Sequence, residues 1–260
     1  MSAVISPVVR MERDGGLARV VIGSGVRRNA LTTGGWEGIE RAFRELAGND
    51  AVRAVVLEGA SGWFCAGSDI REWEHASPDQ VADSFARMEA ACTAVEELAV
   101  PVIAKVRGPA AGAGCQLALA CDLRVLAHGA SIGMPIARLG ILVSPAFAYR
   151  LAAHGGRSLA GDLLFTGRMV LARDAVRLGL ANACVPSDEL EHQVDAIVDS
   201  ILHGSAAAIR AAKRAISHLA TPARIAAGAA LGPPADHDDF RRGVEAFLQR
   251  RRRRSVRLPT

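Results

Sequence analysis

Phe64-Cys65-Ala66-Gly67-Ser68-Asp69 and Gly112-Ala113-Gly114-Cys115-Gln116 are the two stretches that decide the fold. Each follows a strand-like segment, and each is small and glycine-rich where a helix is expected to begin. At a helix start the backbone N–H groups lack partners, and the helix dipole favours negative charge. Two such N–H groups that converge on one point form an oxyanion hole. The two stretches therefore predict a site that stabilises a developing negative charge.

Length and composition indicate a protein with a full hydrophobic core. The chain has 260 residues, of which 50% are hydrophobic, enough for one large domain or two small ones. No apolar run reaches the roughly 18 uninterrupted residues of a membrane span, and residues 1–11 lack the pattern of a secretory signal. The five cysteines are scattered without a Cys-x-x-Cys pair, as is typical of reduced thiols. We expect a cytoplasmic protein with no bound metal and no membrane partner.

Positive charge gathers at the C-terminal end. The formal net charge is +4, and residues 250–254 are five consecutive arginines, with Arg257 just beyond. Such a block is usually a solvated chain end, and the functional alternatives are a phosphate contact or weak nucleic-acid binding. No aromatic residue lies between these arginines, so we do not expect a stacking surface for single strands or a nucleic-acid partner.

Strands and helices are expected to alternate up to about residue 140. Apolar, β-rich runs predict strands at 17–22, 51–57, 102–106 and 123–126, and helical spacing predicts helices around 33–46 and 78–98. This alternation favours an α/β fold. Beyond residue 140 the pattern predicts mainly helices, at 145–153, 158–164, 173–178, 189–202, 205–219 and 238–252. We expect a core over 1–200 that holds the site and a helical region over 201–260, as one continuous unit.

Several motifs occur in an order and spacing that is specific. They are Arg28-Asn29-Ala30-Leu31, 64–70, Pro101-Val102-Ile103-Ala104, 112–122, Pro135 with Leu139-Gly140, Leu164-Phe165-Thr166-Gly167, 172–180 and 239–251. Through them the chain resembles the crotonase, or enoyl-CoA hydratase/isomerase, superfamily. The resemblance implies ββα units wound into a spiral, a helical region that helps to form a trimer, and a homotrimer or hexamer. It also implies an acyl-CoA thioester as substrate, whose coenzyme A is part of the substrate rather than a separate cofactor.

The same resemblance assigns site residues by their places in the motifs. The oxyanion-hole donors would be the backbone N–H groups of Ser68 and Ala113. Contacts to coenzyme A would come from Arg28, Ala30, Ala66, Ser68 and Ile70. Tight packing of strand against helix is the alternative explanation of the glycines, and an ordinary exposed side chain is the alternative for Arg28.

The chain departs from the family pattern where catalytic acids are expected. Hydratases of this family use two glutamates, and the resemblance places those positions at Gln116 and Ile136. A third acid position, used by other members, falls at Ser144. Glutamine does not transfer a proton near neutral pH, and isoleucine does not form hydrogen bonds. Asp69, beside the Ser68 donor, is a weak candidate for a proton-transfer group.

The chemistry that remains possible is stabilisation of an enolate without a pair of catalytic carboxylates. Water addition to a 2-enoyl-CoA is therefore not expected. Decarboxylation of a malonyl-type thioester fits best because its first step needs no strong base, whereas isomerisation or thioester hydrolysis would need Asp69, His75 or a bound water. The alternatives are a catalytically degenerate acyl-CoA-binding or assembly protein, and RNA binding through the arginine block, as one branch of the superfamily is known to do.

Overall fold

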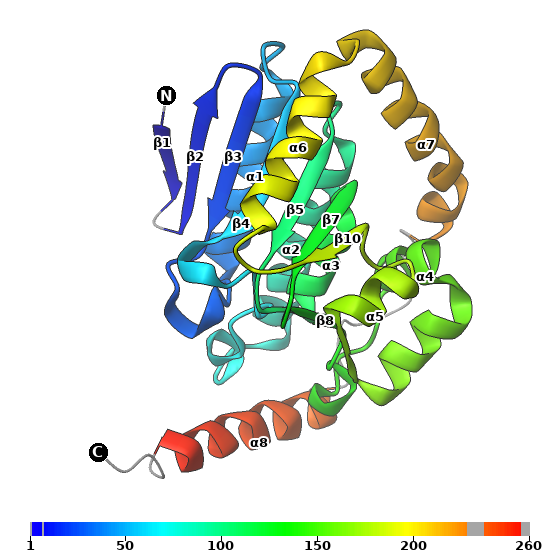
Figure 1. Ribbon diagram of the computed structural model, residues 1–260. Helices are drawn as coiled ribbons and strands as arrows, with labels where there is room; N and C mark the ends of the chain where they lie inside the picture. Colours follow the sequence, from blue (N-terminus) through cyan, green and yellow to red (C-terminus); the bar gives the residue numbers. More distant parts are fainter. Residues whose placement is uncertain (1, 7, 228–236, 256–260) are drawn as a thin grey trace.

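The protein is a mixed α/β structure built on two sheets (Figure 1). The computed structural model describes residues 2–6, 8–227 and 237–255. The strands are β1 (Ser2–Ser6), β2 (Val9–Asp14), β3 (Leu17–Ile22), β4 (Ala54–Gly59), β5 (Val102–Val106), β6 (Pro109–Ala111), β7 (Leu123–Ala127), β8 (Ser131–Gly133), β9 (Met169–Leu171) and β10 (Ala183–Val185). The helices are α1 (Thr33–Ala47), α2 (Pro78–Glu97), α3 (Ala113–Ala120), α4 (Pro145–Thr166), α5 (Ala172–Arg177), α6 (Leu190–His203), α7 (Ala206–Ala227) and α8 (His237–Ser255).

The larger sheet has the strand order β1-β2-β3-β4-β5-β7-β10. Its first three strands are antiparallel, and from β3 to β10 each neighbouring pair is parallel. The smaller sheet, β6-β8-β9, pairs β6 parallel and β9 antiparallel to β8. Because β5 leads directly into β6 and then into α3, the two sheets meet where the second glycine-rich stretch begins.

Helices cover both faces of the larger sheet, and successive side chains of its central strands point to opposite faces. Val55 and Leu57 of β4 pack into the main core with α1 and α2, whereas Val56 and Ile103 pack against α6. Figure 1 shows α6 lying across the near face of the sheet, with α1, α2 and α3 behind it. The central strands are therefore apolar on both faces, which explains their continuous apolar runs.

The C-terminal part is helical, as the sequence predicts. The two helices expected at 145–153 and 158–164 are the two halves of α4, which are separated by a kink at Gly156, where φ is 77° and ψ is 167°. Helix α8 packs across the short 3₁₀ helices Ile70–Trp73 and Ala137–Leu139, and the ring of its Phe240 lies 5.4 Å from that of Trp73.

The expected α/β class and helical C-terminal part are thus both observed. No described helix combines the length and apolarity of a membrane span. The arginine block continues α8, where Arg250 is exposed; the side chains of residues 251–254, and Arg257, lie outside the described residues.

Candidate active site

The first glycine-rich stretch runs beside the segment that follows β3. The Leu31 N–H donates to the Gly67 carbonyl at 2.9 Å, and the Asp69 N–H donates to the Leu31 carbonyl at 2.8 Å. The Ser68 N–H lies between these two bonds on the opposite edge of the chain. Across the described residues it donates no hydrogen bond. This edge therefore presents one unpaired amide.

The second stretch presents another unpaired amide at the start of α3. Gly112 has a φ of 56° and a ψ of −120°, a conformation that L side chains rarely adopt. Its N–H donates to the Gly133 carbonyl at 2.9 Å, and its carbonyl accepts from Cys115 and Gln116. The N–H of Ala113, the first residue of α3, has no acceptor within the described part of the chain.

The two stretches pack backbone against backbone. A Cβ on Gly67, whose φ is 98°, would lie 2.7 Å from the Ala111 carbonyl oxygen and 3.3 Å from the Ala113 nitrogen. A Cβ on Gly114 would lie 2.2 Å from the Cys65 carbonyl oxygen. The glycines therefore permit close packing, and that packing places the Ala113 nitrogen beside Gly67, the residue that precedes Ser68. The predicted oxyanion hole requires two amides on adjoining stretches of this kind.

Side chains around Ser68 fix the first amide in place. The Trp36 Nε1–H donates to the Ser68 Oγ at 3.1 Å, and the Trp36 ring is fully buried in α1. The Asp69 carboxylate pairs with Arg27 at 2.8 Å and accepts the Arg71 N–H at 3.4 Å, which caps the following 3₁₀ helix. Asp69 is thus committed to structural contacts on both oxygens.

The segment expected to contact coenzyme A is ordered by one buried amide. Three successive residues, Arg27, Arg28 and Asn29, have φ angles of 53°, 55° and 57°, which costs energy in residues with a Cβ. The Asn29 Nδ2 donates to the carbonyls of Ala60 and Trp63 at 2.9 and 2.6 Å, and its Oδ1 accepts the Gly25 N–H at 2.7 Å. These bonds hold the segment in its left-handed turn.

The five residues assigned to coenzyme A lie on two adjoining segments. The Ala66 N–H donates to the Arg28 carbonyl at 3.0 Å, so the segment of Arg28 and Ala30 runs directly beside that of Ala66, Ser68 and Ile70. The Arg28 guanidinium is exposed and lies 5.0 Å from the centre of the Trp63 ring. This places an accessible cation at the edge of the paired segments.

The three positions assigned to catalytic acids hold no acid, and their side chains have other roles. Ile136 is buried, and its Cγ2 would lie 3.7 Å from a Cβ on Gly112. Ser144 is exposed and caps α4, because its Oγ accepts the Phe147 N–H at 3.2 Å. Gln116 has no exposed surface, so no solvent reaches its side chain.

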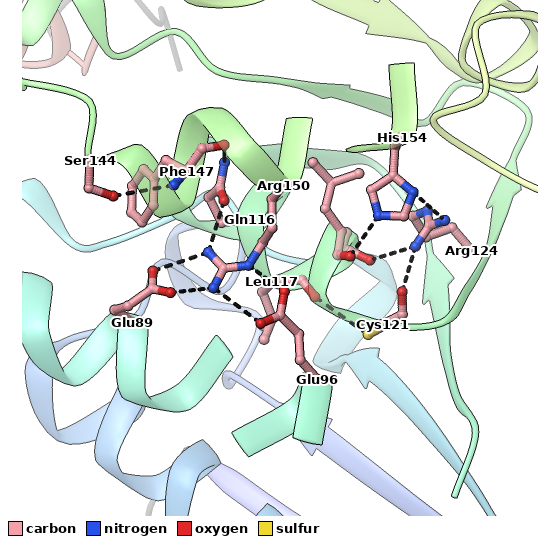
Figure 2. A network of polar contacts seen from close by, with 12 residues as sticks. Glu89, Glu96, Gln116, Leu117, Cys121, Arg124, Ser144, Phe147, Arg150 and His154 are labelled. Atoms are coloured by element: carbon pink, nitrogen blue, oxygen red, sulfur yellow. Dashed lines mark hydrogen bonds and ion pairs between the residues drawn. The ribbon is translucent and has the colours of Figure 1, made fainter. Parts of the chain in front are cut away.

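Gln116 belongs to a buried ionic network (Figure 2). The Arg150 guanidinium, 4% exposed, donates to the Gln116 Oε1 at 3.1 Å. It also pairs with Glu89 and with Glu96, the latter at 2.7 Å. Both carboxylates come from α2, and Arg150 comes from α4. The network therefore joins three helices at the turn that follows the second unpaired amide.

A second buried cation lies at the other end of α3, also drawn in Figure 2. Arg124 donates to the carbonyls of Leu180 and Cys121 at 2.8 and 2.6 Å, and the α3 C-terminus favours its positive charge. His154 lies 3.4 Å from Arg124 and 3.0 Å from the Leu119 carbonyl. Burial, together with the nearby Arg124 charge, lowers the pKa of His154 to about 4, so it is neutral at physiological pH.

The cysteines near the glycine-rich stretches are packing residues. Burial raises the pKa of the Cys65 and Cys115 thiols to about 12, which keeps both thiols protonated and poor as nucleophiles. His75, by contrast, is exposed on the segment after Trp73.

Sequence reasoning missed the residues that support the site from a distance. Glu89 and Glu96 are seven residues apart on one helix, and Arg150 interrupts an apolar stretch of another; a charged residue in such a stretch is the signal that was present. Nothing in the sequence indicated that Trp36 bonds to Ser68, because a tryptophan on the apolar face of a helix is typically a core residue.

Comparison with known proteins decides the family. The enoyl-CoA hydratase/isomerase family model matches residues 12–254. The chain belongs to this family. Short-chain-enoyl-CoA hydratase from Clostridium acetobutylicum is 31% identical over 210 residues, which cover 80% of each chain. This crotonase-superfamily member also superposes on an enoyl-CoA hydratase/isomerase from Mycobacterium paratuberculosis with a TM-score of 0.85 at 26% identity, covering 93% of this chain and 98% of the other.

A further crystal structure agrees with this assignment. An enoyl-CoA hydratase/carnithine racemase from Magnetospirillum magneticum has a TM-score of 0.80 at 30% identity, covering 84% of this chain and 82% of that one. The expected crotonase fold is therefore confirmed for the family member described here. The roles of single residues, the oligomeric state and the division at residue 200 stay predictions.

Proposed function

We propose that this crotonase-family protein binds an acyl-CoA thioester and stabilises its enolate at the amides of Ser68 and Ala113. The observation that carries the proposal is the pair of unpaired N–H groups on two stretches packed backbone to backbone. Fixed donors stabilise an oxyanion without reorganising, and removal of one such donor typically costs on the order of 3 kcal/mol of barrier. The exposed Arg28 is available for a charge-assisted contact with a phosphate of coenzyme A.

The same geometry disfavours water addition to a 2-enoyl-CoA. General acid–base catalysis contributes roughly 10²- to 10⁴-fold, and it needs a group that exchanges a proton within hydrogen-bond reach. Gln116 and Ile136 are buried and do not ionise, and Ser144 is occupied as a helix cap. Asp69 is held by Arg27. These contacts support a reaction whose first step needs only the amides of Ser68 and Ala113 and a correctly oriented substrate.

Decarboxylation of a malonyl-type thioester meets that requirement. The bond between the α-carbon and the carboxylate breaks, carbon dioxide leaves, and the electron pair moves into the thioester to give the enolate. The amides of Ser68 and Ala113 hold the enolate oxygen. Water then delivers a proton to the α-carbon, which completes an acetyl-type thioester, and the hydroxide that remains combines with the released carbon dioxide to give bicarbonate. No step withdraws a proton from the substrate, so no strong base is needed.

Incubation with malonyl-CoA, followed by mass spectrometry, tests this reaction. We expect acetyl-CoA to form faster with protein than without it. Titration calorimetry with the same ester separates the alternative of a non-catalytic binder, which would show binding but no product. A protein that neither binds nor converts acyl-CoA esters would contradict the proposal as a whole.

We also propose the acyl-CoA partner, the oligomeric state and the cellular location that the family and the sequence predict. Family membership supports an acyl-CoA partner and a homotrimer or hexamer, and light scattering in solution measures the assembly directly. The scattered, unpaired cysteines support a cytoplasmic location, which fractionation of expressing cells checks.

A further inference from the structure

A small cavity opens on one face of the larger sheet, where β3, β4 and β5 end. Its volume is about 270 Å³, and one side of it is a row of side chains in register across four strands. Arg10 of β2 is paired with Val21 of β3. Val21 is in turn paired with Glu58 of β4, which is paired with Lys105 of β5. Residues paired in this way share a face of the sheet, and the bond from Lys105 to Glu191 at 2.5 Å shows that α6 lies on that face.

The rest of the lining comes from residues 59–63, where β4 ends and a loop follows, and from Arg107, directly after β5. Trp63 is 37% exposed, and Ser61 on the same loop is exposed as well. The Arg10 side chain is exposed, and that of Arg107 is half-buried. The cavity is therefore open to solvent.

The charges that line the cavity do not balance. Among the described residues that line it, Glu58 is the one carboxylate. Lys105, which is 8% exposed, pairs with both Glu58 and Glu191 and is neutralised by them. Within the described residues, the side chains of Arg10 and Arg107 make no hydrogen bond and no ion pair. Two guanidinium charges thus lie at the cavity without a counter-ion from the described part of the chain.

Two such arginines beside one small cavity are suited to a compact dianion. A guanidinium presents forked donors that match the oxygens of a phosphate, and charge-assisted bonds of this kind are stronger than neutral ones. A phosphate group carries a charge of about −1.5 to −2 near pH 7, which matches two guanidiniums. Sites for larger organic ligands usually have volumes of roughly 300–1,000 Å³, so the volume favours a phosphate group over a whole nucleotide.

We propose that this cavity is a binding site for a phosphate dianion, held by Arg10 and Arg107. None of the five residues assigned to coenzyme A is among the described residues that line it, so the site is distinct from the one proposed for the thioester. The two adjoin at one loop, because Asn29 donates to the carbonyls of Ala60 and Trp63, and both of these residues line the cavity. The inference does not rest on the proposed function.

Titration calorimetry with inorganic phosphate tests the proposal, with chloride at equal ionic strength as the reference. We expect saturable binding of one phosphate per chain. Because the unfolded chain lacks the site, phosphate at ten times its Kd should raise the Tm by about 3–6 °C over that in chloride. Arg10→Gln and Arg107→Gln each remove one charge-assisted contact and should weaken phosphate binding by about tenfold or more.

Arg41→Gln is the matched control. Arg41 is an exposed arginine of α1 that likewise has no ion pair within the described residues and does not line the cavity. Its loss should change the phosphate affinity by less than about twofold. Because none of these three arginines has a partner to lose, all three variants should keep the wild-type Tm in chloride. A loss of phosphate binding is thereby separated from a loss of folded protein.

A wild-type protein without saturable phosphate binding overturns the inference. An equal loss in Arg41→Gln also overturns it, because phosphate would then respond to net charge alone. The titration is repeated with saturating acetyl-CoA, which should leave the phosphate affinity within about twofold. Displacement of phosphate by acetyl-CoA would show that the cavity belongs to the coenzyme A site, and would overturn the inference but not the proposed function. A protein that binds phosphate but no acyl-CoA ester would contradict the proposed function and leave this site standing.

Discussion

Gly67→Ala tests whether the first stretch needs a glycine for close packing. The φ of Gly67 is 98°, where a residue with a Cβ is strained by roughly 1–2 kcal/mol. The new Cβ would lie 2.7 Å from the Ala111 carbonyl oxygen, and backbone atoms cannot rotate away as a side chain can. Overpacking of this kind typically costs about 1–3 kcal/mol more. We expect the free energy of unfolding to fall by about 2–5 kcal/mol.

Urea unfolding and a thermal scan measure this loss. For a chain of this size each kcal/mol corresponds to roughly 2–4 °C, so the expected fall in Tm is roughly 4–20 °C. The Ala113 nitrogen lies 3.3 Å from the same Cβ, so the amide pair should shift as well. Enolate stabilisation should weaken by more than the loss of folded protein accounts for.

Gly34→Ala is the matched control within the same chain. Gly34 lies in the first turn of α1, has no atom within 4 Å of its Cβ position and has an ordinary negative φ. Alanine there should be neutral or stabilising by about 0.4–1 kcal/mol. The reasoning fails if Gly67→Ala is as stable as Gly34→Ala.

Three further changes have expected outcomes. Asn29→Ala should lower the free energy of unfolding by about 2–4 kcal/mol in urea, because buried carbonyls lose their donor; a change below 0.5 kcal/mol, the usual size for surface sites, would show that the left-handed turn holds without it. His154, with its pKa lowered to about 4 from 6.5, is neutral in the fold, whereas the unfolded chain takes up a proton below about pH 6.5. Stability should therefore fall by about 3 kcal/mol from pH 7 to pH 4, and His154→Gln should flatten that part of the urea-unfolding profile. Arg150→Met should cost about 3–5 kcal/mol because two carboxylates lose their cation, whereas Arg168→Met, at an exposed pair, should leave the unfolding midpoint unchanged; equal effects would contradict the burial argument.

Local patterns predicted most of the elements. The run at 102–106 is β5, because a proline precedes it and apolar side chains fill both faces. Helices α1 and α2 begin at Thr33 and Pro78, as expected, and the structure shows that Thr32 and Ser77 cap them. Strands β1 and β2 were not predicted, and the three-residue strands β6 and β8 are too short to show a period. The break between the helices expected at 145–153 and 158–164 is the non-helical Gly156 of α4.

In the candidate site, the features that depend on local sequence were predicted, and those that depend on contacts between distant residues were not. Positive φ angles at Gly67 and Gly112 are local properties, so the sequence predicted the two turns. The partners of Arg150 lie 61 and 54 residues away in the chain, and no local pattern connects them. The acid-free positions were predicted from the motifs, but the burial of Gln116 comes from the packing of α4 and residue 134 against α3.

A competition between two thioesters tests the central claim most directly. Malonyl-CoA and crotonyl-CoA are incubated together with the protein, and both products are followed by mass spectrometry. We expect acetyl-CoA to accumulate while crotonyl-CoA stays unhydrated, because the three acid positions of the family hold no acid and Asp69, beside Ser68, is paired with Arg27. Rapid hydration of crotonyl-CoA with malonyl-CoA left unchanged would contradict the account.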